Sequence, residues 1–231
     1  MLLGLLFVYT ALVPGALLPA ASWSSQAPAA IAGQRFTGRP AKGRFLVASH
    51  SLTAPNFSES VILLLGHEAG GSMGIVINRP TDVRLASLLP GVSELRDRPD
   101  RVSFGGPVGM NAMTLLIRAR RQPTKSQPIF ADVYASGDLD SLREALLRKE
   151  ETEQMRAYVG YAGWGSGQLE QEIARGDWYV GPADAASVFD PSPTKLWGKL
   201  IDRFSGEWTR EERPRLREHA GERRASYRRE W

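Results

Sequence analysis

Residues 158–170, with the sequence YVGYAGWGSGQLE, constrain the fold more than any other stretch of the chain. An apolar run is followed by glycines at positions 163, 165 and 167 around Trp164, and a polar segment with helical character comes next. Glycine has no Cβ, so it adopts positive φ or lets a second backbone approach closely where other residues cannot. We therefore expect a strand, then a turn of special backbone geometry, and then a helix.

The composition indicates one globular domain, or at most a domain and a half. The chain has 231 residues, of which 42% are hydrophobic and 23% charged, so it is long enough to bury a substantial core. It contains no cysteine, which excludes disulfides, thiolate nucleophiles and zinc–thiolate sites. The three histidines, His50, His67 and His219, are too scattered to indicate a metal cluster. We predict no metal site and no cofactor.

The first 34 residues differ from the rest of the chain. No charged side chain occurs before Arg35, and residues 2–18 are an apolar run interrupted by Pro14. The A-x-A pattern at 27–29 is typical of a signal-peptide cleavage site, although Lys and Arg are absent from the n-region. A run of about 17 apolar residues is marginal for a membrane-spanning helix. A secretory signal, a membrane anchor and a translation start placed too early, with the native protein beginning near Gly33, all fit this leader.

The other end of the chain is a charged tail at 205–231, with eight Arg and six Glu. It has few apolar residues to bury, so we expect a solvated helix or a disordered segment. The expected organisation is a leader at 1–34, a folded domain at 35–204 and the tail.

The net charge of +4 and the sequence pI of 9.6 raise the question of nucleic-acid binding. Eight Arg minus six Glu leave +2 in the tail, so half of the net charge lies outside the domain. The one tight basic cluster of the body, Arg118, Arg120 and Arg121, fits a solvated strand end better than a phosphate contact. We therefore do not expect direct nucleic-acid binding.

Apolar patterning in the body predicts a mixture of strands and helices. A continuous apolar run at 61–65 and a β-branched run at 74–78 are separated by glycine-rich turn residues, which predicts a hairpin whose second strand ends at Pro80. The other strands are expected at 45–49, 114–117, 129–135 and 158–162, and the helices at 140–148, 169–175, 183–189 and 194–204.

The glycine loop fails the sequence templates for nucleotide binding and for serine hydrolases. The third glycine of G-x-G-x-x-G would fall at Gln168, and no Gly-Lys-Ser/Thr follows as in a P-loop. The nucleophile elbow G-x-S-x-G needs glycines two residues to either side of Ser166, where Trp164 and Gln168 stand. A triad of Ser166 with His50 or His67 and an acid is the remaining hydrolase alternative, but no spacing selects it. We predict no catalytic residue.

Five residues are candidates for ligand binding. Asn78 and Arg79 lie where a strand that is expected to be buried emerges, a common position for binding groups in α/β proteins. Gln168 and Glu170 lie in the first turn of the next helix, where they could line a polar cleft beside Trp164. Structural alternatives exist: Asn78 capping the turn, Arg79 pairing with a carboxylate, and Glu170 favouring the helix dipole. The predicted ligand-binding set is Asn78, Arg79, Trp164, Gln168 and Glu170.

Several motifs occur together in a fixed order. They are GRFLVAS at 43–49, PNF at 55–57, SVILLLGH at 60–67, GIVINRPT at 74–81, FGGPV at 104–108, YVGYAGWGSGQLE at 158–170 and GDW at 176–178. In this order they resemble the YqgE/AlgH family of bacterial proteins, over about 43–204. The resemblance implies an α+β (mixed α/β) fold, with a single domain whose branched mixed β-sheet is partly barrel-like and surrounded by helices.

The biochemical role of that family is poorly known. One branch is associated with regulation of alginate synthesis, and its members are often described as transcriptional regulators. No helix-turn-helix motif and no strongly basic surface is evident in the present sequence. The resemblance implies a cytoplasmic location, with export or membrane anchoring through residues 1–30 as the alternative. We expect no integral membrane domain beyond this leader.

The expected function is that of a non-enzymatic regulatory or binding protein, which recognises an unknown small ligand or protein partner. The scarcity of converging His and carboxylate pairs favours binding over catalysis. The alternative is an enzyme of unknown reaction that uses the same cleft, near Trp164, Gln168 and Asn78. A histidine of the body within hydrogen-bond reach of Ser166 or Glu170, in a concave pocket, would favour the enzyme.

Overall fold

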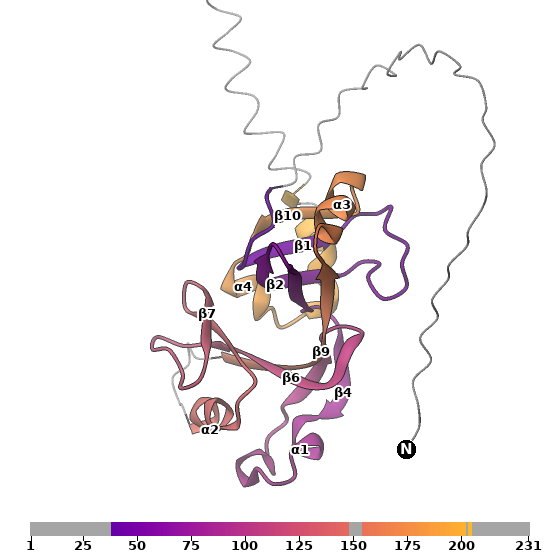
Figure 1. The fold of residues 1–231 in the computed structure, drawn as a ribbon. Helices are drawn as coiled ribbons and strands as arrows, with labels where there is room; N and C mark the ends of the chain where they lie inside the picture. The colour runs from indigo at the N-terminus through magenta and orange to yellow at the C-terminus, as the bar shows by residue number, and fades with distance from the viewer. Residues whose placement is uncertain (1–37, 148–153, 202, 205–231) are drawn as a thin grey trace, which may run out of the picture. The chain divides into compact units, whose positions relative to one another are not determined.

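The computed structural model describes residues 38–147, 154–201 and 203–204. The expected leader at 1–34 and the charged tail at 205–231 lie outside the described residues. Within the described part, ten strands form one mixed sheet, and short helices pack on it (Figure 1). The α+β fold implied by the family resemblance is confirmed, as a single domain of mostly strands with a branched and curled sheet.

The main path through the sheet contains eight strands, each antiparallel to the next. Their order is β10 (Trp178–Pro182), β1 (Arg44–Ala48), β2 (Val61–Glu68), β3 (Gly71–Val76), β9 (Gln154–Gly165), β6 (Val108–Arg118), β8 (Val133–Ser136) and β7 (Gln127–Phe130). The path curls so far that β7 approaches the start of β1, where a Cβ on Gly43 would lie 2.9 Å from the Ile129 carbonyl oxygen.

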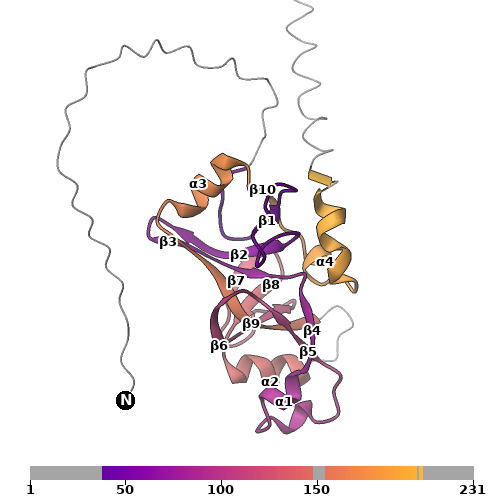
Figure 2. The ribbon, with the colours of Figure 1, turned by 90° about the vertical axis from the view of Figure 1, so that its right-hand side faces the viewer.

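The sheet branches at β9. Two short strands leave the main path: β4 (Pro80–Arg84) pairs with β5 (Arg101–Phe104), and β5 lies parallel to β9. The C-terminal part of β9 pairs with β3, whereas its earlier residues pair with β5 and β6. This one long strand therefore joins the two parts of the sheet (Figure 2).

Glycines at the bend of β9 make the branching possible. Gly160 has φ 74°, and a Cβ on it would overlap the carbonyl oxygen of Gly106. In turn, Cβ atoms on Gly105 and Gly106 would overlap the backbone of β9 at Gly160 and Tyr161. The FGGPV segment and β9 therefore pass each other at a distance that only glycine permits.

The helices are short and lie mainly in the connections between strands. The C-terminal one covers residues 196–201 and 203–204. The others are α1 (Leu85–Leu88), η1 (Ser93–Leu95), α2 (Leu139–Leu147), α3 (Gln168–Arg175), α4 (Ala185–Val188) and η2 (Pro193–Lys195).

Three hydrophobic clusters form the core. Because side chains alternate along a strand, Phe45 of β1 packs in the first cluster with the C-terminal helix, whereas Leu46 packs in the second, against α3. The third cluster lies between β5, β6 and β9 on one side and α1, η1 and α2 on the other, and it includes Leu115 and Leu142. Helices thus cover both faces of the sheet.

Most of the expected elements are confirmed with shifted ends, and two expectations are wrong. β2 and β3 form the expected hairpin, but β3 ends at Val76 and Pro80 begins β4, an edge strand where a missing N–H is tolerated. The single strand expected at 129–135 is two strands, β7 and β8, with a turn at Ala131, whose φ is 42°. Short polar turns of this kind interrupt an apolar run without glycine or proline.

The geometry of the glycine loop is only partly as expected. Gly167 has φ 71° and is the N-cap of α3. Gly163 and Gly165 lie inside β9 and do not have positive φ. The glycine of this strand that has positive φ is Gly160, three residues before the loop.

The variant Gly160→Ala should lower the free energy of unfolding by about 3 kcal/mol or more, because its Cβ would meet the Gly106 carbonyl at a positive φ. Urea unfolding of the full chain, followed by tryptophan fluorescence, measures the change. Gly66→Ala is the matched control: Gly66 also lies in a strand, and its Cβ would meet nothing within 4 Å, so we expect less than about 1 kcal/mol. Equal losses in the two variants would contradict the close crossing.

Tyr158 is a buried phenol in the first core cluster, with 0% of its surface exposed and no partner for its hydroxyl among the described residues. Burial raises the pKa of Tyr158 to about 12, and the nearby Arg156 guanidinium offsets this only in part, without a hydrogen bond of normal geometry. The stability that depends on the neutral phenol is therefore complete below the unfolded pKa of about 10, and it is lost as the pH rises through about 12.

We expect Tyr158→Phe to unfold at neutral pH with an equal or higher free energy, by up to about 1 kcal/mol, because an unpaired buried hydroxyl is removed. Above pH 10 the advantage of the variant should grow, because phenylalanine has no proton to lose. Urea unfolding of both proteins at several pH values between 7 and 11 tests this. If the substitution left the alkaline loss of stability unchanged, Tyr158 would not be its source.

Candidate functional site

The end of β9 builds an aromatic cluster beside α3. The buried Trp164 ring lies between Phe57 and Trp178, with ring centroids 6.4 and 6.1 Å away. Phe57 and Trp178 also contact each other, edge to face, at 6.0 Å. Aromatic pairs in such arrangements contribute about 0.5–1.5 kcal/mol each beyond the area that they bury. The cluster therefore holds the loop that carries Phe57 against β9 and β10.

One carboxylate, that of Glu172, joins the two tryptophans. Its Oε2 accepts hydrogen bonds from Nε1 of Trp164 and from Nε1 of Trp178, both at 2.8 Å. Its Oε1 accepts from Gln168 Nε2 at 3.0 Å, and Gln168 Oε1 accepts from the Gly165 N–H at 3.1 Å. Residues 168 and 172 lie one turn apart on the same side of α3, which makes this possible. The indole N–H of Trp164 and the amide of Gln168 are thus engaged within the protein.

The turn between β2 and β3 is fixed on the start of α3. Ser166 Oγ donates a hydrogen bond to the Ala69 carbonyl at 2.7 Å. Gly71 has φ 140°, and a Cβ on it would overlap the Trp164 carbonyl oxygen. Ser166 therefore connects the glycine loop to the hairpin, and its hydroxyl proton is already donated.

His67 lies beside this turn, between a serine and a carboxylate. Its Nδ1 is 2.8 Å from Oγ of Ser72 on the neighbouring strand, and its Nε2 is 3.5 Å from Glu170 Oε1. The side chains of His67 and Glu170 are 21% and 49% exposed, whereas Ser72 is only 9% exposed. A partly exposed contact of this kind, which is an ion pair only when the imidazole is protonated, contributes at most about 1 kcal/mol. In serine hydrolases an imidazole and a carboxylate activate a serine hydroxyl, so the row formed by Ser72, His67 and Glu170 could also support acid–base chemistry.

Asn78 and Arg79 hold the segment that leads into β2. Asn78 is 7% exposed; its Oδ1 accepts from the Val61 N–H and its Nδ2 donates to the Glu59 carbonyl, both at 2.9 Å. Arg79 Nη2 donates to the Ser58 carbonyl at 3.1 Å. Both side chains therefore satisfy backbone groups of one connection, and Arg79 bonds to a carbonyl instead of the carboxylate considered from the sequence.

The five predicted ligand-binding residues fall into two groups. Three of them meet at the junction of β9 and α3, around Trp164. Asn78 and Arg79 lie beyond the other end of β3: the residue opposite Trp164 is Ser72, six positions before Asn78, which corresponds to about 20 Å along an extended strand. The two groups contact the same connection, residues 57–60, from different sides.

Two important contacts were not predicted from the sequence. The spacing of Gln168 and Glu172 indicates that they share one side of a helix, but it does not show that two distant indoles reach the same carboxylate. The contact of His67 with Ser72 follows from the hairpin register, in which these residues are opposite each other. A two-residue turn at Ala69 and Gly70 was the sequence feature that could have shown it.

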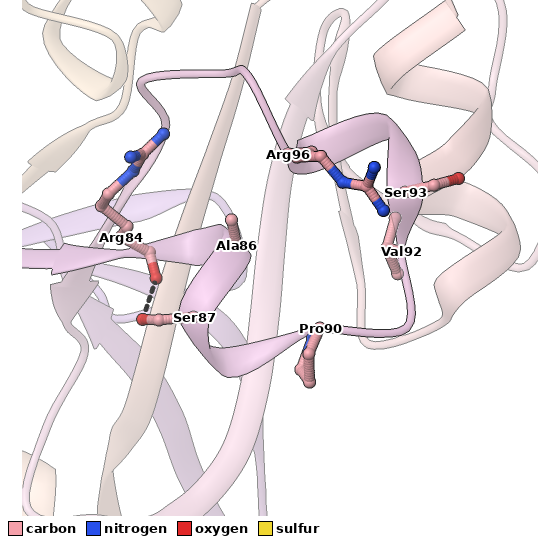
Figure 3. A pocket seen from close by; sticks show the side chains of 7 residues that line it. All are labelled: Arg84, Ala86, Ser87, Pro90, Val92, Ser93 and Arg96. Carbon is pink, nitrogen blue, oxygen red and sulfur yellow. Dashed lines mark hydrogen bonds between the residues drawn. The ribbon is translucent and has the colours of Figure 1, made fainter.

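Two cavities are described away from this junction. One, of about 300 Å³, lies between α1 and η1 and is lined by arginine and serine residues (Figure 3). The other, of about 360 Å³, is lined by residues that include Met73 and Lys125. Neither His67 nor Glu170 lines either cavity.

Two absences concern residues 38–147, 154–201 and 203–204. In these ranges no three His, Asp or Glu side chains converge as metal ligands. None of the helices in the same ranges has the length and apolar character needed to cross a membrane.

The variant Glu172→Ala should lower the free energy of unfolding by about 2–4 kcal/mol, because it leaves two buried indole N–H groups without an acceptor. Near-UV circular dichroism and urea unfolding measure the loss of the aromatic cluster and of stability. Gln171→Ala, an exposed neighbour on α3, is the control and should change stability by less than about 0.5 kcal/mol. A tryptophan signal and stability equal to those of the control would show that Glu172 does not organise the cluster.

The sequence of this chain is similar to those of a known protein family. Residues 45–209 match the model of the AlgH-like family. A UPF0301 protein of Streptomyces avermitilis is 38% identical over 168 residues, which cover 71% of this chain and 87% of the relative. A UPF0301 protein of Chlamydia abortus is 33% identical over 167 residues, covering 72% and 88%.

Solved structures agree with the sequence relatives. A crystal structure of a Corynebacterium diphtheriae protein superposes with a TM-score of 0.63 at 26% identity, covering 73% of this chain and 89% of that one. The solution structure of the AlgH protein from Pseudomonas aeruginosa gives a TM-score of 0.60 at 28% identity, covering 71% and 88%. These matches confirm the resemblance carried by the sequence motifs, and the chain belongs to the AlgH-like (YqgE/AlgH) family.

Proposed function

We propose that the protein is a non-enzymatic regulatory or binding protein that recognises a small ligand or a protein partner. The proposed recognition surface, termed the hairpin–helix surface, consists of His67, Ala69, Ser166, Gln168 and Glu170. The observation that carries the proposal is the 2.7 Å hydrogen bond from Ser166 to the Ala69 carbonyl, which fixes the hairpin turn on the start of α3. A surface that is ordered before it binds loses little conformational entropy on binding.

The hairpin–helix surface offers a carboxylate and an imidazole to a partner. Glu170 is 49% exposed and His67 is 21% exposed, and they lie 3.5 Å apart. A partly exposed pair of this kind can open toward a ligand at a cost of about 1 kcal/mol or less. The surface therefore suits a partner with hydrogen-bond donors or a positive charge.

The predicted site residues outside this surface support it from behind. Trp164 donates to Glu172, which also accepts from Gln168 and thereby orients α3. Asn78 and Arg79 hold residues 58–61, and the neighbouring Phe57 ring stacks on Trp164. In this proposal their contribution to binding is to keep the junction rigid.

One contact and one low exposure favour binding over catalysis. The hydroxyl of Ser166 donates to a backbone carbonyl, so it is not available to a histidine. Ser72 contacts His67 but is only 9% exposed, and a nucleophile must be reached by its substrate.

A hydrolytic enzyme that uses Ser72, His67 and Glu170 is the second candidate. The 2.8 Å contact between Ser72 Oγ and His67 Nδ1 favours it. In such an enzyme His67 would take the proton from Ser72, and Glu170 would stabilise the imidazolium.

The full chain purified from its own cells should retain a bound small molecule or partner in native mass spectrometry. The double variant His67→Ala/Glu170→Ala should lose this species, because the imidazole and the carboxylate of the surface are both removed. The double variant Asp82→Ala/Arg101→Ala, which removes an exposed ion pair of 3.2 Å elsewhere, should keep it. A wild type without any bound species, or equal retention by both double variants, would contradict binding at this surface.

A fluorophosphonate probe distinguishes the two candidates, because it reacts with activated serines. We expect no labelling of the wild type. Labelling of Ser72 that disappears in His67→Ala would support the enzyme and overturn the non-enzymatic proposal.

Family members are often described as transcriptional regulators. We propose that any regulatory role of this protein acts through a ligand or a protein partner. Arg118 lies 2.7 Å from Asp132 and Arg98 lies 2.6 Å from Asp100, so these cations are already paired and do not form a free basic surface.

We also propose a cytoplasmic location on the family resemblance. The alternative is export or anchoring through residues 1–30, which lie outside the described residues, and the N-terminus found by mass spectrometry of cell fractions separates the two.

A further inference from the structure

The end of β4 and the segment between β4 and β5 line an open surface cavity of about 300 Å³. Figure 3 shows Arg84, at the end of β4, on one side, and Arg96, directly after η1, with Val92 and Ser93 on the other. Pro90 lies at the bend that connects the two sides. The cavity is thus open to two guanidinium groups and has an apolar wall.

This cavity is formed by a well-packed part of the chain. Leu85 and Leu95, which lie next to its lining residues, are buried in the third core cluster, and Val92 itself is 5% exposed. The Val92 N–H donates to the Leu89 carbonyl at 3.0 Å, and the Leu95 N–H donates to the Val92 carbonyl at 3.1 Å. The backbone around the cavity therefore needs no rearrangement to accept a ligand.

The arginines of the cavity differ from the neighbouring ones in their partners. Arg98 and Arg101 form ion pairs with aspartates at 2.6 and 3.2 Å. Arg84 donates to the Arg98 carbonyl at 3.0 Å, and neither Arg84 nor Arg96 pairs with a carboxylate in the part of the chain that the structure describes. Two positive charges at one cavity are therefore left without a counter-charge from these residues.

Two carboxylates are close in sequence to the cavity wall, Glu94 and Asp97. Glu94 accepts from Ser93 Oγ at 3.1 Å and lies 3.9 Å from Arg143 of α2. Hydrogen bonds from its own backbone N–H and from Ser93 hold the pKa of Glu94 below its ordinary value. Neither carboxylate forms an ion pair with the cavity arginines, so an external anion would not have to displace one.

We propose that this cavity binds a small organic molecule that carries two anionic groups, either phosphates or carboxylates. A guanidinium group binds such oxygens through parallel N–H donors. Because the two arginines stand on opposite sides of the cavity, one anionic group for each fits better than a single anion held by both (Figure 3). The uncharged frame of the ligand lies over Pro90 and Val92. This site is separate from the hairpin–helix surface and does not depend on the proposed function.

The test is an NMR titration of the full chain with three probes at constant ionic strength: inorganic phosphate, citrate and fructose 1,6-bisphosphate. Saturable shifts are expected at the amides of Ser87 and Ser93, and the preferred two-anion probe should bind at least about tenfold more tightly than inorganic phosphate. A preference for the bisphosphate or for citrate distinguishes phosphate from carboxylate recognition.

Arg96→Gln removes one cavity charge and no hydrogen bond of the described residues, so it should fold normally and weaken binding at least about tenfold. Arg101→Gln removes the same charge outside the cavity and should keep the affinity within about twofold. The proposal is overturned by an absence of saturable shifts with all three probes, by equal affinity for inorganic phosphate, or by equal losses in the two variants, which would indicate diffuse charge attraction.

Discussion

The close crossing of two backbones at Gly105, Gly106 and Gly160 is the contact on which the rest of the structure depends. At this point the Gly105 N–H donates to the Val159 carbonyl at 2.7 Å, and the Gly105 carbonyl accepts from the Val76 N–H at 2.8 Å. The FGGPV segment thus bridges β9 and β3 while β9 bends at Gly160. Without the bend, one strand could not pair with β3 at one end and with β5 and β6 at the other, so the branched sheet and its three core clusters would not form together.

The glycine loop that follows Gly160 in β9 also serves the fold. Its most conspicuous side chains serve the fold: Trp164 and Gln168 share the carboxylate of Glu172, and Ser166 fastens the loop to the hairpin turn. At this junction Glu170 is exposed and His67 partly exposed, beside the exposed but internally bonded Ser166 and Gln168. A rigid support with a small exposed polar pair favours recognition of a partner more than catalysis, because catalysis requires an accessible nucleophile beside its base.

The elements that the sequence predicted well are those with a strong local pattern. The apolar run of β2, the β-branched run of β3 and the Gly176 cap of α3 can each be recognised from a short stretch of local sequence. The short strands β4, β5 and β10 were not expected, because four or five residues carry too little periodicity and are made strands by their partners. The division of 129–135 into β7 and β8 depends on a turn at Ala131 that has no typical turn residue.

The sequence by itself determined the family, the overall fold class, the absence of cysteine chemistry and the set of polar residues from which a site could be built. Only the tertiary structure decided which of those residues meet. It separated Asn78 and Arg79 from Trp164 by the length of β3 and brought Ser72 to His67 by the hairpin register. It also placed Arg84 and Arg96 at one cavity without a carboxylate partner among the described residues. The physical reason is that hydrophobic patterning and glycine positions act through local backbone preference, whereas contacts between side chains depend on strand register and on the crossing at Gly160.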